Sequence, residues 1–185
     1  MLRAIATRGL SSLRCASRDH RRTLDMRTLE QLAAGISSLH PKIQRMHEYW
    51  LSKRADRLMP SRADVDPLEL RDCLGNLCIV DVTGETPARF RFRLDGSNLV
   101  LSTGFDMTGK FLEEMPDAEY RRFVTAIYQR VLETRAPVFV VNQEDWKGYD
   151  LQVESVTVTD VLPDVANAPP VLTCSATSPP TTTSI

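Results

Sequence analysis

The segment 89–95 constrains the fold more than any other part of the chain, because phenylalanine and arginine alternate along it. In an extended strand, alternate side chains point to opposite sides. The apolar side holds Phe90, Phe92 and Leu94, and the basic side holds Arg89, Arg91 and Arg93. Because the apolar side needs a core, we expect a β-sheet with at least one covered face.

The basic side of this strand has two possible uses. Three like charges repel one another unless acidic groups, water or an anion meet them. If the side lines a cavity, Arg91 and Arg93 can each bind a carboxylate or a phosphate through two hydrogen bonds. If it faces outward, it meets the N-terminal helix, a second subunit or water. We favour the outward orientation, because the phenylalanine side needs the core.

Turn residues and periodicity predict the other elements. Asp66 can cap a short helix over residues 67–74, with Pro67 at its first position and Glu69 closing a capping box. We also expect strands over residues 77–82, 138–143, 151–159 and 171–177, and short helices over 97–103 and 110–115. Asp117 begins the longest helix, which runs to about Arg135. Its predicted buried stripe is Phe123, Val124, Ile127, Tyr128 and Val131.

Apolar residues near the N-terminus recur at spacings of three and four. They are Leu29, Leu32, Ile36, Leu39, Ile43, Met46 and Trp50. This heptad repeat predicts a helix within a helical segment over residues 26–58. The apolar seam either belongs to a helix that joins two copies of the chain, or to one helix or two short ones that lie on their own domain. Pro41 removes one helical hydrogen bond, although it falls on the outer side of the seam.

The two ends of the chain differ in composition from the rest. Residues 1–24 hold six arginines, no lysine and one acid. Such a segment is a start-site artefact with Met26 as the true start, an organellar transit peptide, or a functional basic arm. We expect residues 1–25 to be a disordered basic leader or an artefact. Residues 178–185, rich in threonine and proline, are expected to be a disordered tail.

Composition excludes several classes of protein. The net charge of −1 favours neither nucleic acid nor membranes as partners. No apolar run approaches the roughly 20 residues that span a bilayer. The four scattered cysteines are typical of reduced thiols, so we expect a cytoplasmic protein.

The order of the expected elements resembles a PAS domain. The chain is similar to a bacterial PAS-like family of small stand-alone proteins over about residues 45–160. The motifs that carry the resemblance are Tyr49-Trp50, Pro60-Ser61-Arg62-x-Asp64-x-Asp66-Pro67, Phe90-Arg91-Phe92-Arg93-Leu94-x-Gly96 and Thr108-Gly109. It implies an α+β fold over residues 59–177. A five-stranded antiparallel sheet, short helices and one long connecting helix would enclose a cavity, with a further helix before them.

The sequence offers no convincing catalytic or metal site. The histidines precede the expected sheet, and Cys73 and Cys78 lack zinc-site spacing, so we expect buried thiols and no cofactor. Asp64 and Asp66 could act as paired carboxylates. However, Asp66 is expected to cap a helix and Arg62 to pair with Asp64, which leaves no catalytic residue.

The resemblance therefore implies a non-enzymatic sensory or regulatory domain. The expected cavity is lined by Phe90, Phe92, Leu94, Leu99, Phe105, Phe111, Val138 and Val140. It would hold a small, mostly apolar ligand or be packed shut. A homodimer would signal to a separate regulatory protein partner through its contact or its N-terminal helix. The alternatives are a ligand-free dimeric scaffold and a small enzyme.

Overall fold

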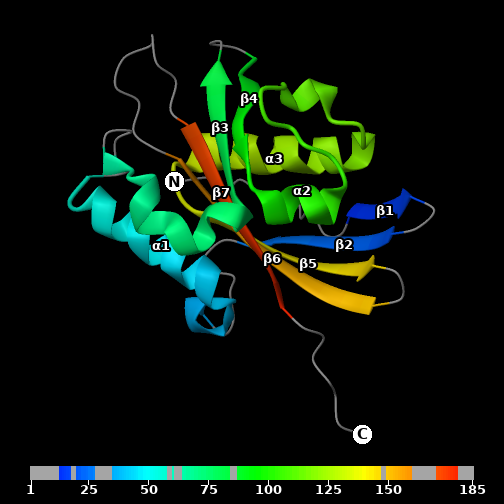
Figure 1. Ribbon diagram of the computed structural model, residues 1–185, viewed down its shortest axis with the longest axis horizontal. Coiled ribbons are helices and arrows are strands. Elements are labelled where there is room, and N and C mark those ends of the chain that lie inside the picture. Colours follow the sequence, from blue (N-terminus) through cyan, green and yellow to red (C-terminus); the bar gives the residue numbers. More distant parts are fainter. Residues whose placement is uncertain are drawn as a thin grey trace, which may run out of the picture.

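The computed structural model describes residues 13–17, 20–27, 35–57, 60, 64–83, 87–146, 149–159 and 170–178. Its centre is a seven-stranded antiparallel sheet in the order β1-β2-β5-β6-β7-β3-β4 (Figure 1). The strands are β1 (Leu13–Ser17), β2 (His20–Arg27), β3 (Leu77–Thr83), β4 (Arg89–Asp95), β5 (Val138–Trp146), β6 (Tyr149–Thr159) and β7 (Pro170–Ser178). The strands from β5 to β4 form the predicted five-stranded antiparallel sheet, so the predicted α+β class is confirmed.

The first two strands extend the sheet beyond its predicted edge. β2 pairs with β5, from Arg22 opposite Glu144 to Arg27 opposite Phe139, and β1 pairs with β2. From the sequence, we expected a basic leader and the start of a helical segment here. Pairing with a strand more than 100 residues away is a tertiary effect that local composition does not reveal. The expected tail lies outside the described residues, except for Ser178.

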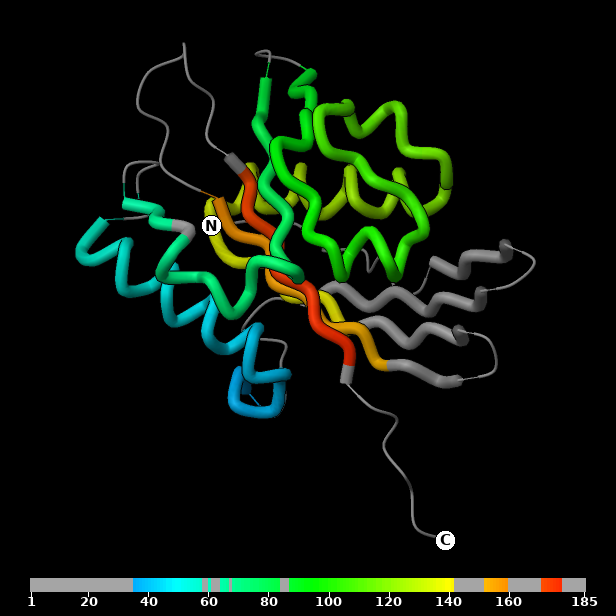
Figure 2. The backbone as a smooth tube through the Cα atoms, in the orientation of Figure 1, coloured from blue at the N-terminus to red at the C-terminus, as the bar shows by residue number. Residues whose placement is uncertain are grey.

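Helices cover both faces of the sheet (Figure 1). They are α1 (Pro41–Arg54), α2 (Ser97–Thr103), α3 (Ala118–Thr134) and the short 3₁₀ helices η2 (Ile36–Ser38), η4 (Pro67–Asn76) and η5 (Leu112–Glu114). One core cluster joins α1 and η4 to one face, and a second joins α3 to the other. Figure 2 shows β7 running through the middle of the molecule, between β6 and β3. The central strands of the sheet are therefore buried on both faces.

The longest helix, α3, follows its prediction closely. The Asp117 carboxylate accepts hydrogen bonds from the backbone N–H groups of Glu119 and Tyr120, both at 2.9 Å. Arg135 ends the helix in the left-handed conformation. All five residues of the predicted stripe are buried: Phe123, Val124, Ile127, Tyr128 and Val131. This helix was predictable because its N-cap residue and its regular apolar spacing are both local sequence signals.

The N-terminal helix is shorter than predicted. α1 begins at Pro41, and His40 is its N-cap, with its Nδ1 accepting a hydrogen bond from Lys42 N–H at 3.1 Å. Before it, η2 ends in an extended Leu39, so the described stretch holds two separate helices, which is the alternative of two short helices and not of one continuous helix. Pro41 is the reason, because proline fits the first position of a helix better than its interior. Leu29 and Leu32 lie outside the described residues.

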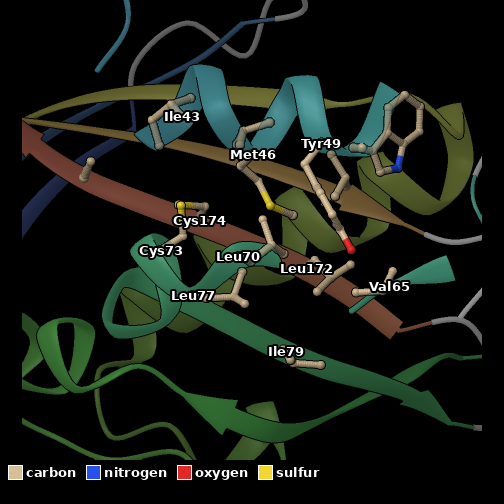
Figure 3. Close-up of a cluster of buried hydrophobic side chains, with 14 of the residues drawn as sticks. Ile43, Met46, Tyr49, Val65, Leu70, Cys73, Leu77, Ile79, Leu172 and Cys174 are labelled. Atoms are coloured by element: carbon tan, nitrogen blue, oxygen red, sulfur yellow. The ribbon is translucent and has the colours of Figure 1, made fainter. Parts of the chain in front are cut away.

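The described part of the apolar seam packs within one chain. Ile43 and Met46 are fully buried, and Leu39 and Trp50 are nearly so. They belong to the core cluster formed with η4, β6 and β7 (Figure 3). This is the alternative in which the helix lies on its own domain. Whether the seam also joins two copies of the chain stays a prediction. Ile36, another residue of the seam, is half-buried.

The Asp66 cap is confirmed, whereas the capping box is wrong. The Asp66 carboxylate accepts a hydrogen bond from Leu68 N–H at 2.9 Å. Asp66 N–H, however, donates to the Tyr49 hydroxyl at 2.8 Å, and Glu69 pairs with Lys53 at 2.6 Å. α1 supplies both competing partners. The helix it caps is a 3₁₀ segment with a kink at Leu70, not a short α-helix.

Other motif residues also hold elements together. Trp50 Nε1 donates to the carbonyl of Thr159 at 3.0 Å and so ties α1 to β6. Asp64 pairs with Arg57 at 2.7 Å. Arg62 lies outside the described residues, so its expected pairing with Asp64 stays a prediction. Pro60 is buried.

Candidate functional site

A β-bulge in β4 determines which side chains reach the second face of the sheet. Val80 pairs with Phe92 and Ile79 pairs with Leu94, which leaves Arg93 as an extra residue. Phe92 therefore packs with α3, whereas Leu94 packs against the cluster under α1. The prediction that Leu94 shares a side with the phenylalanines is wrong for this reason. The side chain of the next residue, Asp95, lines a cavity beneath α2 and α3.

The three arginines of β4 face outward, as favoured. All three are exposed. Arg93 pairs with Asp81 at 2.7 Å, and Arg89 pairs with Glu113 at 3.2 Å. Arg91 Nε donates to the carbonyl of Gly109 at 3.3 Å. These carboxylates and the carbonyl offset the repulsion between the three like charges.

The cavity lies between the sheet and the helices α2 and α3, and its volume is about 140 Å³. Strands β3, β4, β6 and β7 form its floor, and α2, α3 and the loop between α2 and η5 form its walls. The apolar and aromatic part of its lining comprises Phe92, Leu99, Phe105, Met107, Met115, Tyr120, Phe123, Val124, Ile127, Tyr128, Val153 and Ala176. The rest consists of Asn76, Cys78, Asp95, Asn98, Ser102, Thr103, Ser155, Thr157, Thr173, Ser175 and Thr177.

The floor of the cavity carries a ladder of hydroxyl groups. Ser155 and Thr157 of β6 lie opposite Ser175 and Thr173 of β7, and Thr177 continues the row. The Thr157 and Thr173 hydroxyls are 3.1 Å apart and hydrogen-bonded. On the other face, the same strands present tightly packed apolar side chains: Val156, Val158, Leu172 and Cys174. The same face also holds the buried Glu154, whose carboxylate accepts a hydrogen bond from His40 N–H. The row of hydroxyl groups, however, lies on the face that borders the cavity.

Two buried polar groups lie deeper in the site. The Cys78 thiol and the Tyr128 hydroxyl are 3.9 Å apart. Burial raises the pKa of both groups, so both stay protonated near neutral pH. They are neutral hydrogen-bonding groups and not nucleophiles.

Asp95 is the ionisable carboxylate of the lining. One of its oxygens accepts a hydrogen bond from Met107 N–H at 3.2 Å. Its own N–H donates to the Thr108 hydroxyl at 3.2 Å. Partial burial raises the pKa of the Asp95 carboxyl above its usual value, because the charged form is desolvated; the Met107 bond opposes this rise and Asp106 adds to it.

The structure brings together part of the predicted cavity. Phe92, Leu99 and Phe105 line it. Phe90, Val138 and Val140 are buried in the same cluster but do not reach the space. Phe111 is half-buried at the edge of the sheet, where Arg89 stacks on its ring at 4.0 Å. The hydroxyl ladder was not predicted from the sequence, because serine and threonine at alternate positions look like ordinary strand residues until the strand register is known.

A pair of thiols lies on the opposite face of the sheet. Cys73 and Cys174 are both buried, and each sulfur lies 3.9 Å from the carbonyl oxygen of Lys42. A hydrogen bond between the two thiols lowers the pKa of Cys73 and raises that of Cys174. The burial predicted for Cys73 and Cys78 is confirmed. Within the described part of the chain, no three histidine, cysteine or acidic side chains gather as a metal site.

Comparison with known families assigns the fold. The family model of the PAS domain matches residues 38–158, which is more than half of the chain. The chain therefore belongs to the PAS domain family, whose members are generally sensory or interaction domains without enzymatic activity. Neither the curated proteins nor the solved structures contain a match. Among the described residues, no helix is long and apolar enough to cross a membrane.

Proposed function

We propose that the chain is a non-enzymatic sensory domain whose cavity binds a small ligand. The contrast between the two faces of β6 and β7 supports this proposal, because hydroxyl groups line the cavity face and mainly apolar side chains cover the other. Hydroxyl groups are costly to bury without partners, so a fully packed interface with α3 would favour the apolar residues found on the opposite face. Thr157, a wholly buried residue, has its hydroxyl hydrogen-bonded to that of Thr173 on the cavity floor.

The dimensions and lining limit the class of ligand. A cavity of about 150 Å³ accommodates benzene, whereas drug-sized ligands need about 300 Å³ or more. The cavity here, about 140 Å³, therefore suits a molecule with one small ring or a short chain. Its apolar part would lie against Phe105 and Phe123, and its polar part would reach the hydroxyl ladder.

A polar contact offers a route from the cavity to the N-terminal helix. Asn76 and Asn98 line the cavity, and Asn98 Nδ2 donates to Asn76 Oδ1 at 3.0 Å. Lys42 of α1 donates to the same oxygen at 2.6 Å. A ligand that displaces α2 changes this shared acceptor and so acts on α1. We propose that α1 carries the signal to a separate protein partner or to a second copy of the chain.

The sequence motif suggests a narrower family. The run from Pro60 to Pro67 is typical of small stand-alone bacterial PAS-like proteins. In that family, we propose, the motif serves the fold, since Asp66 caps η4 and Asp64 bonds to Arg57. Signal reception would then fall to the cavity residues.

Native mass spectrometry of the full chain tests the proposed function. The protein is purified without denaturation, and any bound molecule is extracted and identified. Leu99→Trp fills the cavity from α2, whereas Leu101→Trp adds the same ring to the exposed side of that helix. We expect a small molecule on the natural chain and on Leu101→Trp, and its loss from Leu99→Trp.

Two results would contradict the proposal. A ligand-free protein that also binds no small probe would favour the ligand-free scaffold. A molecule that remains bound to a folded Leu99→Trp protein would place the binding site elsewhere. Circular dichroism of both variants checks that each is folded.

A further inference from the structure

The charge of the cavity lining selects the type of ligand more sharply than its size does. Asp95 carries a carboxylate into the lining. No lysine, arginine or histidine of the described chain lines the cavity. An anionic ligand would meet one like charge and no compensating cation, in surroundings where charges are poorly screened. This lining therefore disfavours carboxylates and phosphates.

Asp95 has room for a partner. Oδ2 accepts one hydrogen bond from Met107 N–H, and no described residue pairs with the carboxylate as a salt bridge. Two lysines of neighbouring segments bond to other groups: Lys42 donates to Asn76, and Lys110 donates to the carbonyl of Asp106. A half-buried carboxylate without a cation is stabilised when a cation arrives.

The bulge at Arg93 places Asp95 in this position. In a regular strand, Asp95 would face the same side as Arg89 and Arg91. The extra residue turns it toward the cavity, whose lining Asp95 shares with five aromatic rings. These rings are Phe92, Phe105, Tyr120, Phe123 and Tyr128. Aromatic faces attract cations, and the attraction grows where water is excluded.

We infer that the cavity binds a small organic cation, an amine or ammonium compound with a compact apolar body. The cationic head would lie at Asp95, and the body would lie between the aromatic rings and the hydroxyl ladder. This inference rests on the proposed function, because it concerns the same cavity. It adds a charge preference that volume and polarity alone do not give.

Isothermal titration calorimetry on the full chain tests the charge preference. Benzylamine, benzyl alcohol and benzoate share one ring and differ mainly in charge. At pH 7, we expect benzylamine to bind at least about tenfold more tightly than benzyl alcohol, and benzoate to bind most weakly. Asp95→Asn keeps an oxygen acceptor for Met107 N–H, so it should fold. It should remove the amine preference and change benzyl alcohol affinity by about twofold or less.

A control separates the local carboxylate from net charge. Asp72→Asn makes the same charge change at an exposed position outside the cavity lining, so it should keep the amine preference. If the natural chain binds benzylamine no more tightly than benzyl alcohol, the cation inference is overturned while the ligand cavity stands. If none of the three probes binds, the cation inference and the proposed function both lose their support.

Discussion

Gly96 is a motif residue whose role follows from a close backbone approach. A Cβ atom there would lie 2.5 Å from the carbonyl oxygen of Gly75, at the contact between η4 and the start of α2. Gly104, in contrast, has open space but a φ of +80°. We predict that Gly96→Ala lowers the free energy of unfolding by about 2–3 kcal/mol, because backbone segments must separate. Gly104→Ala should cost about 1–2 kcal/mol through its left-handed conformation alone. Urea unfolding measures the free energy of unfolding of both variants. A smaller loss for Gly96→Ala than for Gly104→Ala would contradict the close backbone approach.

His47 should make stability depend on pH. It is buried beside the ring of Phe139, and burial lowers its pKa; Glu48 opposes this shift and Arg54 adds to it. The unfolded state, with a histidine pKa of about 6.5, then takes up a proton before the folded state does. The free energy of unfolding should be fully retained above that pH and should fall as the pH drops below it.

Urea unfolding at pH 7.5, 6.5 and 5.5 checks this dependence. His47→Leu should flatten the decline over this range. His40→Asn keeps a capping side chain on α1 and should leave the decline in place. An equal decline in His47→Leu would assign the effect to other groups.

At the scale of elements, α1 is held by its own sheet. Met46 is fully buried in the cluster with Leu70 and Leu172 (Figure 3). We predict that Met46→Ala lowers the free energy of unfolding by about 2–5 kcal/mol and leaves the oligomeric state unchanged. Leu51→Ala, on the exposed side of the same helix, should change it by less than about 1 kcal/mol. Loss of a dimer without loss of stability in Met46→Ala would show instead that the seam is an interface.

The last strand should be essential to the fold, although the family match ends before it. β7 pairs with β6 on one side and with β3 on the other. Its removal would expose two strand edges and part of both core clusters. We predict that a chain ending at Thr159 loses cooperative unfolding, whereas a chain ending at Ser178 keeps it. Circular dichroism during thermal unfolding distinguishes the two, and a cooperative transition in the shorter chain would contradict this topology.

Elements with strong local signals were predictable, and those set by tertiary contacts were not. Capping by Asp117 and a regular apolar period gave α3 from sequence. The heptad period across residues 29–50 is equally regular, yet Pro41 sets the true start of α1. The bulge at Arg93 leaves no sequence signal, because it depends on how β3 pairs with β4. It moves both Leu94 and Asp95 to the sides opposite those implied by strict alternation.

For the whole molecule, the five-stranded part of the fold was predictable, and the chemistry of its cavity was only partly so. The order of elements indicated a PAS domain and a cavity bordered by Phe92, Leu99 and Phe105. The hydroxyl ladder arises only when β6 and β7 pair in register, over contacts that no local pattern encodes. The sequence therefore predicted an apolar site, whereas the cavity has one polar floor and one carboxylate.

We propose that the space beneath α2 and α3 is a binding site. Amide chemical-shift mapping of the full chain with benzyl alcohol shows whether a small probe occupies it. We predict that the largest shifts centre on Cys78, Thr157 and Thr173, and that Leu99→Trp abolishes them while Leu101→Trp does not. Shifts centred on α1 and η4, or no saturable shifts at all, would contradict the claim.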